Sequence, residues 1–298
     1  MSLSVLILTL NEAENLRNCL ESVAWCDDTV VLDSYSEDGT GEVARESGAR
    51  FVQREFDDFA GQRNFGIDHI PFKHEWVFHL DADERFSPEL ADECRKVIAD
   101  DRCSGFLVPS KMVLHGRWLK HAADYPVYQM RLMKLGEVRF VQHGHGQREC
   151  SDRRGLGKLS APYLHYSFSK GLDDWFERHN RYSTMEAEAC LKELEGTGLD
   201  WGGLLSGDPI VKRRALKRLS MRLPFRPWLK FIYMYSLGMG FLDGGPGLTY
   251  CVLQAIYEYM ISLKVRDLRK NRQEVRRQCI SSSSTDPTIL TRKLRGSS

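Results

Sequence analysis

The sequence lacks the features that mark several common protein classes. Its eight cysteines form no CxxC pair and have no zinc-like spacing, which argues against a structural zinc site. It contains no internal repeat, and a formal net charge of +1 indicates no particular partner. The short apolar run at the N-terminus leads directly into acidic residues, unlike a signal peptide. We therefore expect a protein of the reducing cytoplasm, with most cysteines serving as small core residues.

No apolar run is both long and uncharged enough to suit a membrane span. Residues 231–242 are too few to cross, and Asp243 with a GGPG turn follows them. Residues 248–265 come nearer to the required length but contain Glu258. We expect both segments to lie in a membrane interface or to pack on the rest of the protein.

The first hundred residues alternate apolar strands with helical segments. A helix is expected after Asn11, which can act as its N-cap, and a second helix is expected at residues 39–48. Expected strands cover residues 3–10, 28–34, 49–56 and 75–84. This alternation predicts an α/β fold with a doubly wound sheet, in which ligands bind at the carboxyl ends of the strands. Those ends carry Thr9, Asn11, Asp33, Ser34, Asp81 and Asp83.

Three aspartates in this group suit the transfer of a group from a nucleotide diphosphate. Asp81 and Asp83 lie two residues apart, so an extended backbone projects both side chains to one side. One can reach the nucleotide and the other Mg²⁺ or Mn²⁺, which neutralises the departing diphosphate. Asp33 can accept hydrogen bonds from a base or ribose. Taken singly, each aspartate can equally be a solvated or turn carboxylate.

Four motifs together resemble the nucleotide-binding half of the family 2 glycosyltransferases. These are TLNE, DSYSEDGT, GQRN and LDADE, in that order over the first hundred residues. The resemblance implies the GT-A fold, a Rossmann-like doubly wound mixed sheet. It also implies that Thr9, Asn11 and Glu12 border the nucleotide and that Asp33 holds its base or ribose. Asp83 is then a metal ligand, Asp81 is expected to bind the substrate and the metal as well, and Arg63 lies near the diphosphate and donor sugar.

Later motifs resemble the lipopolysaccharide core β-1,4-glucosyltransferases of that family. They read YPVYQMRL, HGHGQRE and HYSFSKGLDDWFERHNRYSTMEAE. The resemblance implies inverting transfer of a hexose, glucose from a uridine diphosphate donor, to a lipid-linked saccharide such as lipopolysaccharide core. His165 stands where many GT-A enzymes bring a further metal ligand, although a lone histidine is more often structural.

An inverting displacement also needs a base on the acceptor side, within hydrogen-bond reach of the attacking oxygen. Related enzymes often carry a His-Glu pair where this chain reads HGHGQRE, so the base is not fixed by the motif. Glu149, Asp124 and Glu84 are the candidates, with Glu149 ranked first. His143 and His145 are either structural or acceptor contacts.

A basic region follows the expected catalytic part. Eight basic residues and no acidic one lie between Lys212 and Lys230, interleaved with apolar residues. Each basic residue near an anionic bilayer can contribute about 1 kcal/mol to binding, so the region predicts peripheral attachment at the cytoplasmic face of the membrane. A solvated basic helix and nucleic-acid binding are the alternatives. The aromatic stretch that follows favours the membrane over nucleic acid.

These patterns divide the chain into three expected parts. They are a GT-A catalytic domain at 1–170, with halves at about 1–110 and 111–170, a helical basic and aromatic extension at 171–268, and a disordered tail at 269–298. Two other functions remain open. A nucleotidyltransferase usually has a glycine-rich loop after its first strand, which LTLNEAEN lacks. A non-catalytic binding protein is disfavoured by the three intact aspartates.

Overall fold

The computed structural model describes residues 3–143, 146–151, 155–196, 200–208, 211–212, 215–216, 219, 223 and 225–283. Contacts divide the chain into two compact units. Unit 1 comprises Met1–His179 and Trp228–Ala255, and unit 2 comprises Asn180–Pro227 and Ile256–Ser298. Unit 1 therefore contains the expected catalytic part together with the aromatic segment that precedes the last helix.

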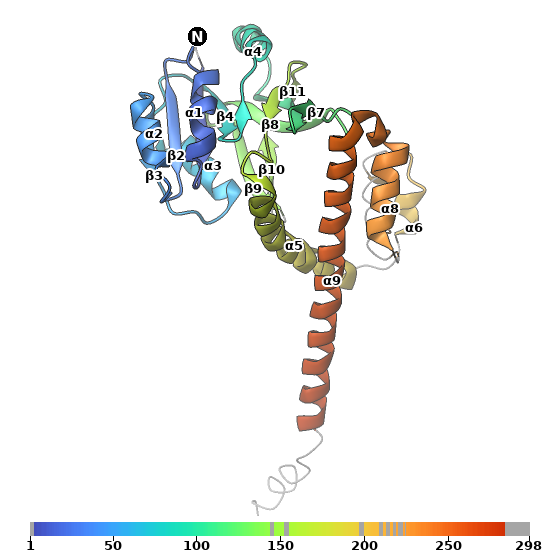
Figure 1. Ribbon diagram of the computed structural model, residues 1–298. Helices are drawn as coiled ribbons and strands as arrows, with labels where there is room; N and C mark the ends of the chain where they lie inside the picture. The colour runs from blue at the N-terminus through green and yellow to red at the C-terminus, as the bar shows by residue number, and fades with distance from the viewer. Residues whose placement is uncertain are drawn as a thin grey trace, which may run out of the picture. The chain divides into compact units, whose positions relative to one another are not determined.

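The N-terminal half of unit 1 is a parallel sheet with helices on both faces (Figure 1). Its strands, in the order β3-β2-β1-β4, are β3 (Arg50–Gln53), β2 (Thr29–Asp33), β1 (Ser4–Thr9) and β4 (Trp76–Asp81). Its helices are α1 (Ala13–Ser22), α2 (Thr40–Glu46) and α3 (Phe59–His69). Val5 and Ile7 pack in the cluster that includes α1, whereas Leu6 packs with Phe65 of α3. Successive strand side chains point to opposite faces, so both faces are covered and the predicted doubly wound sheet is confirmed.

The second half of unit 1 extends this sheet with strands of mixed direction. Along the path after β4 come β8 (Val127–Lys134), β6 (Gly105–Leu114), β12 (Tyr163–His165) and β5 (Glu84–Arg85). β7 (Arg117–Trp118) and β11 (Leu156–Lys158) pair with β6, and β9 (Val138–His143) pairs with β10 (Gly146–Ser151) as a separate hairpin. Helix α4 (Pro88–Asp100) adds Leu90 and Cys94 to the core. The antiparallel pairing of β5 with β12 brings the segment after β4 against a late part of the chain.

Asp243 joins the aromatic segment to the loop between β7 and β8. This segment forms α8 (Arg226–Ile232), a π-helical turn η1 (Tyr233–Leu237) and a 3-10 turn η2 (Gly240–Asp243). Asp243 Oδ2 accepts hydrogen bonds from the backbone N–H groups of His121 and Ala122, each at 2.8 Å. Asp243 is only 4% exposed, so the loop between β7 and β8 is held by a buried carboxylate.

Unit 2 is helical. It contains most of α5 (Gly171–Gly196), α6 (Trp201–Leu204) and the greater part of α9 (Gly244–Ser283). Ala187 and Cys190 pack against Ile261 and Val265, and Lys264 Nζ donates to both oxygens of Asn180.

The last helix continues further than the sequence indicated. α9 reaches Ser283, so residues 269–283 are helical where a disordered tail was expected, while residues 284–298 lie outside the described range. Polar composition suggested disorder, but Leu, Arg, Lys, Gln and Glu are strong helix formers. In the described part of the chain, no helix combines the length and the apolar character needed to cross a membrane.

Candidate active site

The carboxyl ends of β1, β2 and β4 meet at one edge of the sheet. Thr9 is the sheet neighbour of Asp33, and Leu8 is the neighbour of Asp81. Strands lie about 4.8 Å apart, so Asp33 and Asp81 lie on either side of β1 at a backbone separation of about 10 Å. The edge that the sequence indicated is therefore assembled from three adjacent strands.

Asp33 is completely buried and accepts several hydrogen bonds from the protein. Its oxygens accept from Thr9 Oγ1 at 2.9 Å, from Gln53 Nε2 at 3.1 Å, and from the backbone N–H of Ser36 at 2.9 Å and its hydroxyl at 2.5 Å. The carboxylate thus fixes Thr9 and the turn after β2. A nucleotide could contact Asp33 only after one of these donors moved.

The loop between β1 and α1 is held by the loops around it. Asn11 has a positive φ of 55°, and its Oδ1 accepts from the backbone N–H of Glu37. Glu12, not Asn11, is the N-cap residue of α1, so the predicted cap was wrong. Asn11 turns towards the β2–α2 loop because that loop offers a backbone donor. Ser34, after β2, accepts a hydrogen bond from Gln62 of α3 at 3.0 Å.

Glu12 is bound to a lysine that follows β12. Lys170 Nζ lies 2.5 Å from Glu12 Oε1 and 2.5 Å from the carbonyl oxygen of Asn11. Burial raises the pKa of Glu12 above its ordinary value, although the hydrogen bonds from Asn15 and Lys170 oppose this. The loop after β12 is thereby bound to the edge of the sheet at which we expect the nucleotide, which we call the nucleotide edge.

Asp81 is held by two buried arginines. Arg63 Nη2 donates to Oδ1 and Arg131 Nη2 donates to Oδ2, each at 2.8 Å. The positive charges of Arg131 and Arg63 outweigh the effect of burial, so the pKa of Asp81 lies below its ordinary value. Arg63 is only 3% exposed and points at Asp81, whereas the sequence led us to expect it near a diphosphate. Both Asp81 oxygens are engaged, which leaves Asp81 poorly placed as a metal ligand.

Glu84 lies behind the site, in contact with Arg131. Glu84 is fully buried. Its Oε1 accepts a hydrogen bond from Arg131, and its Oε2 accepts one from the backbone N–H of Asp81 at 2.9 Å. Burial raises the pKa of Glu84 to about 7 despite the charge of Arg131. A base must reach the acceptor hydroxyl, so this enclosed position argues against Glu84 as the base.

Asp83 and His165 face each other and fit a divalent cation. Asp83 Oδ2 lies 3.3 Å from His165 Nε2, and each side chain is about one-fifth exposed. Two ligands at adjacent octahedral positions, each about 2.1 Å from the ion, lie about 3.0 Å apart. Although burial disfavours the imidazolium, Asp83 raises the pKa of His165 to about 9. Within the described residues no group of three His, Cys, Asp or Glu converges, so phosphate and water would complete the coordination.

The other two base candidates lie on different elements. Glu149 on β10 is half-buried and pairs with Phe140 across the hairpin, so the two side chains share a face. Phe140 in turn lies under the guanidinium of Arg63, at 5.9 Å from its ring centroid. Asp124 is exposed in the loop that Asp243 holds. His143 lies at the end of β9, and His145 lies outside the described residues.

Sequence reasoning missed Arg131, Ser36 and Lys170. Arg131 is 2% exposed and lies in a run of buried strand residues, where a charged side chain signals a paired acid. Ser36 lies in a stretch whose composition is that of an ordinary turn, so it gave no sign of a contact with Asp33. Lys170 had no local signal, because its partner Glu12 is distant in the sequence.

Comparison with known proteins decides the family. Residues 4–148 match the model of glycosyl transferase family 2, a range that contains the strand edge and the Asp81–Asp83 motif. The chain carries a family 2 glycosyltransferase domain. The predicted GT-A fold class and the resemblance to this family are thereby confirmed.

Relatives of this glycosyltransferase include proteins of similar length. The lipopolysaccharide core biosynthesis glycosyltransferase LpsC of Rhizobium meliloti is 26% identical over 274 residues, which cover 87% of this chain and 92% of LpsC. An uncharacterized glycosyltransferase of Rickettsia bellii is 33% identical over 106 residues, 35% of either chain. Among solved structures, S. aureus TarS 1-349 has a TM-score of 0.42 at 16% identity, covering 90% of this chain and 92% of TarS. The M. tuberculosis glucosyl-3-phosphoglycerate synthase complex with phosphoglyceric acid has a TM-score of 0.44 at 19% identity, covering 62% and 78%.

Proposed function

We propose that this glycosyltransferase transfers a hexose, glucose in the first instance, from a uridine diphosphate donor to a lipid-linked saccharide of the lipopolysaccharide core type. The observation that carries the proposal is the Asp83–His165 pair, at the strand edge that also holds Asp33. The similarity to LpsC over most of both chains supports the acceptor class.

A divalent cation, Mg²⁺ or Mn²⁺, would be held by Asp83 and His165 and would neutralise the charge of the departing diphosphate. Around it, Thr9, Asn11, Glu12 and Ser34 border the nucleotide in this proposal. Asp33 supports the base-binding side by fixing Thr9. Asp81, held by Arg63 and Arg131, keeps the backbone before Asp83 in place.

We infer that Glu149 is the base in an inverting single displacement. Its carboxylate would accept the proton of the acceptor hydroxyl as that oxygen attacks the anomeric carbon, while the nucleoside diphosphate departs. Support comes from its half-buried position beside Phe140, on the same side as Arg63. Glu149→Gln should abolish transfer while leaving binding of uridine diphosphate unchanged. Full transfer by this variant would exclude the assignment and leave Asp124 to be tested next.

Attachment to an anionic membrane surface is part of the same proposal. The segment 228–242 exposes many apolar side chains, several of them aromatic: Trp228, Leu229, Ile232, Tyr233, Leu237, Met239, Phe241 and Leu242. It carries Lys230 and no acidic residue before the buried Asp243. Apolar and aromatic side chains accompanied by positive charge are typical of interfacial segments. Five further basic residues, Arg213, Arg214, Lys217, Arg218 and Arg222, lie outside the described part of the chain.

Calorimetric titration with uridine diphosphate, with and without Mn²⁺, tests the catalytic proposal. We expect binding that depends on the metal, which a scaffold without catalytic function should not show. A panel of nucleotide sugars then identifies the donor by metal-dependent hydrolysis. Absence of metal-dependent nucleotide binding would contradict the proposal.

A further inference from the structure

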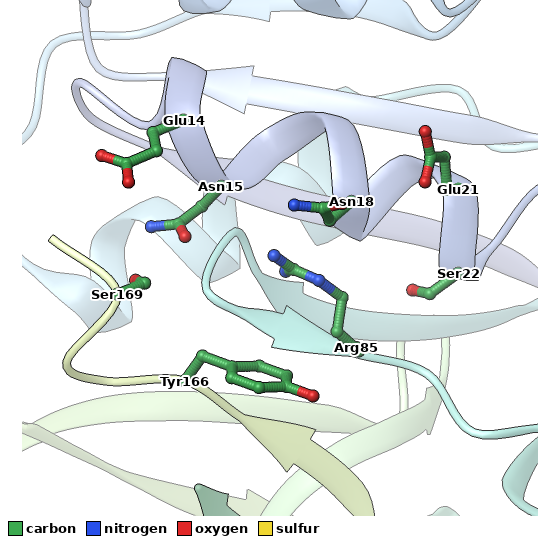
Figure 2. A pocket seen from close by; sticks show the side chains of 8 residues that line it. All are labelled: Glu14, Asn15, Asn18, Glu21, Ser22, Arg85, Tyr166 and Ser169. Atoms are coloured by element: carbon green, nitrogen blue, oxygen red, sulfur yellow. The ribbon is translucent and has the colours of Figure 1, made fainter. Parts of the chain in front are cut away.

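A cavity of about 660 Å³ lies in unit 1, on the side of α1, apart from the residues assigned above. Its lining residues all carry polar groups: Glu14, Asn15, Asn18, Glu21, Ser22, Arg85, Tyr166 and Ser169. Figure 2 shows the guanidinium of Arg85 between Asn18 of α1 and the ring of Tyr166. The volume falls within the range of about 300 to 1,000 Å³ that is typical of small-molecule sites.

The chemistry of the lining selects against two kinds of ligand. Among the described residues, no aliphatic side chain lines the cavity, so an apolar ligand would leave these polar groups without partners. Two carboxylates against one guanidinium give the lining a formal negative charge, which disfavours a phosphate. Sugar hydroxyl groups both donate and accept hydrogen bonds, as carboxylates, amides and a guanidinium require. The lining therefore complements a neutral saccharide better than a nucleotide or a lipid phosphate.

Hydrogen bonds to backbone carbonyl groups also connect the cavity to Asp83 and its two neighbours in the sequence. Arg85 Nη1 donates to the carbonyl oxygens of Ala82 and Glu84, at 2.9 and 2.8 Å. The backbone N–H of Tyr166 donates to the carbonyl oxygen of Asp83 at 2.9 Å. Residues on either side of Asp83 thus bond directly to the cavity wall.

A second connection runs to the nucleotide edge. Asn15 Nδ2 donates to Glu12 Oε2 at 2.8 Å, and Ser169 directly precedes Lys170, which binds the other oxygen of Glu12. A ligand in the cavity would therefore touch neighbours of both Glu12 and Asp83.

We propose that this cavity is a saccharide-binding site for a neutral hexose or a short neutral oligosaccharide, separate from the nucleotide-sugar site. Saccharide binding itself does not depend on the transfer reaction, whereas coupling between the cavity and the donor rests on the proposed function. By linkage, a saccharide that strengthens donor binding must itself bind more tightly when the donor is present.

Two tryptophan substitutions on α1 give a matched test. Asn18→Trp places a large side chain in the cavity, and Arg17→Trp places the same side chain next to it on the helix, outside the lining. Asn18 and Arg17 are both exposed, so neither change disturbs the core. Circular dichroism melting tests whether both variants are folded, and we expect both to be.

Saturation-transfer NMR on the full chain measures binding. The probes are methyl glucoside, methyl galactoside and lactose, each at about 10 mM, with glucose 6-phosphate as the anionic comparison. We expect at least one neutral probe to give signals in the wild type and in Arg17→Trp that are lost in Asn18→Trp. The milder Asn18→Ala, which removes one amide, should weaken binding by roughly 3- to 10-fold.

Three results would overturn the proposal. These are the absence of signals from every neutral probe, equal signals from Asn18→Trp and the wild type, and stronger binding of glucose 6-phosphate than of the neutral probes. Metal-dependent binding of uridine diphosphate, measured on the same samples, tests the proposed function independently of the cavity. Nucleotide binding without saccharide binding rejects the cavity alone, and the reverse rejects the proposed function alone.

Discussion

Asp83 Oδ2 lies 3.3 Å from His165 Nε2, across two strands that are hydrogen-bonded neighbours. β5 begins immediately after Asp83 and pairs with β12, which ends at His165. The backbone N–H of Tyr166 donates to the carbonyl oxygen of Asp83, which continues the pairing by one residue beyond the His165–Glu84 pair. The separation of the two side chains is therefore set by sheet pairing and not by a free loop.

Asp83→Ala should lower transfer by at least about 100-fold, because a preorganised group that stabilises transition-state charge is removed. Metal-dependent binding of uridine diphosphate should be lost as well, as measured by calorimetry. The matched control is Asp92→Ala on α4, which removes an exposed carboxylate that forms an ion pair with Arg95. The control should keep wild-type activity, and full turnover by Asp83→Ala would contradict the metal assignment.

Arg131→Met should destabilise the protein by about 3 to 5 kcal/mol, because it leaves the buried Glu84 without its cationic partner and Asp81 with Arg63 alone. Urea unfolding followed by fluorescence measures the change. Arg139→Met provides the comparison, because Arg139 forms a half-exposed pair with Asp68 and should cost less than about 1 kcal/mol. If both variants lost the same small amount, the buried network would not support the site.

Asp28 should make the stability of the fold depend on acidity. Burial raises its pKa, but hydrogen bonds from Ser4 and the backbone of Lys73, with the charge of Arg50, lower the pKa of Asp28 below its ordinary value. Its contribution is therefore present above an unfolded pKa of about 3.9 and is lost as the pH falls through the lower folded pKa. Asp28→Asn should be less stable than the wild type at neutral pH, and the two should converge in acid. A difference that stayed constant in urea unfolding at both pH values would exclude this role.

The double variant Trp228→Ser, Leu237→Ser should weaken flotation with phosphatidylglycerol vesicles. The two side chains are 68% and 74% exposed, so their replacement removes apolar surface without opening the core. Trp201→Ser is the control, since Trp201 is 65% exposed but lies on α6, outside the segment 228–242. Flotation that is equally reduced by the control, or unchanged in the double variant, would remove the segment 228–242 from membrane attachment.

The sequence predicted the parallel strands well, because each is a short apolar run that ends in a polar group. β1, β2 and β4 fall within the expected ranges, and α5 begins where the helical extension was expected to begin. The antiparallel strands of the second half lack that simple pattern. The pairing of β5 with β12 joins only short segments and has no local signal in the sequence.

The candidate site was predictable at the level of which residues gather, and less so at the level of what each one contacts. Asp33 and Asp81 lie where strand ends were expected, but their oxygens are engaged by Ser36, Arg63 and Arg131. Such contacts depend on side chains that reach across elements, which periodicity does not encode. The Asp83–His165 geometry followed only from the family resemblance.

The pairing of β5 with β12 also bears on synthesis of the chain. The strands that carry Asp33 and Asp81 leave the ribosome early, whereas the imidazole of His165 follows only after most of the mixed half of the sheet has been translated. A nascent or prematurely terminated chain carries the aspartate without its histidine partner. The Asp83–His165 pair is therefore completed only in chains that have reached β12.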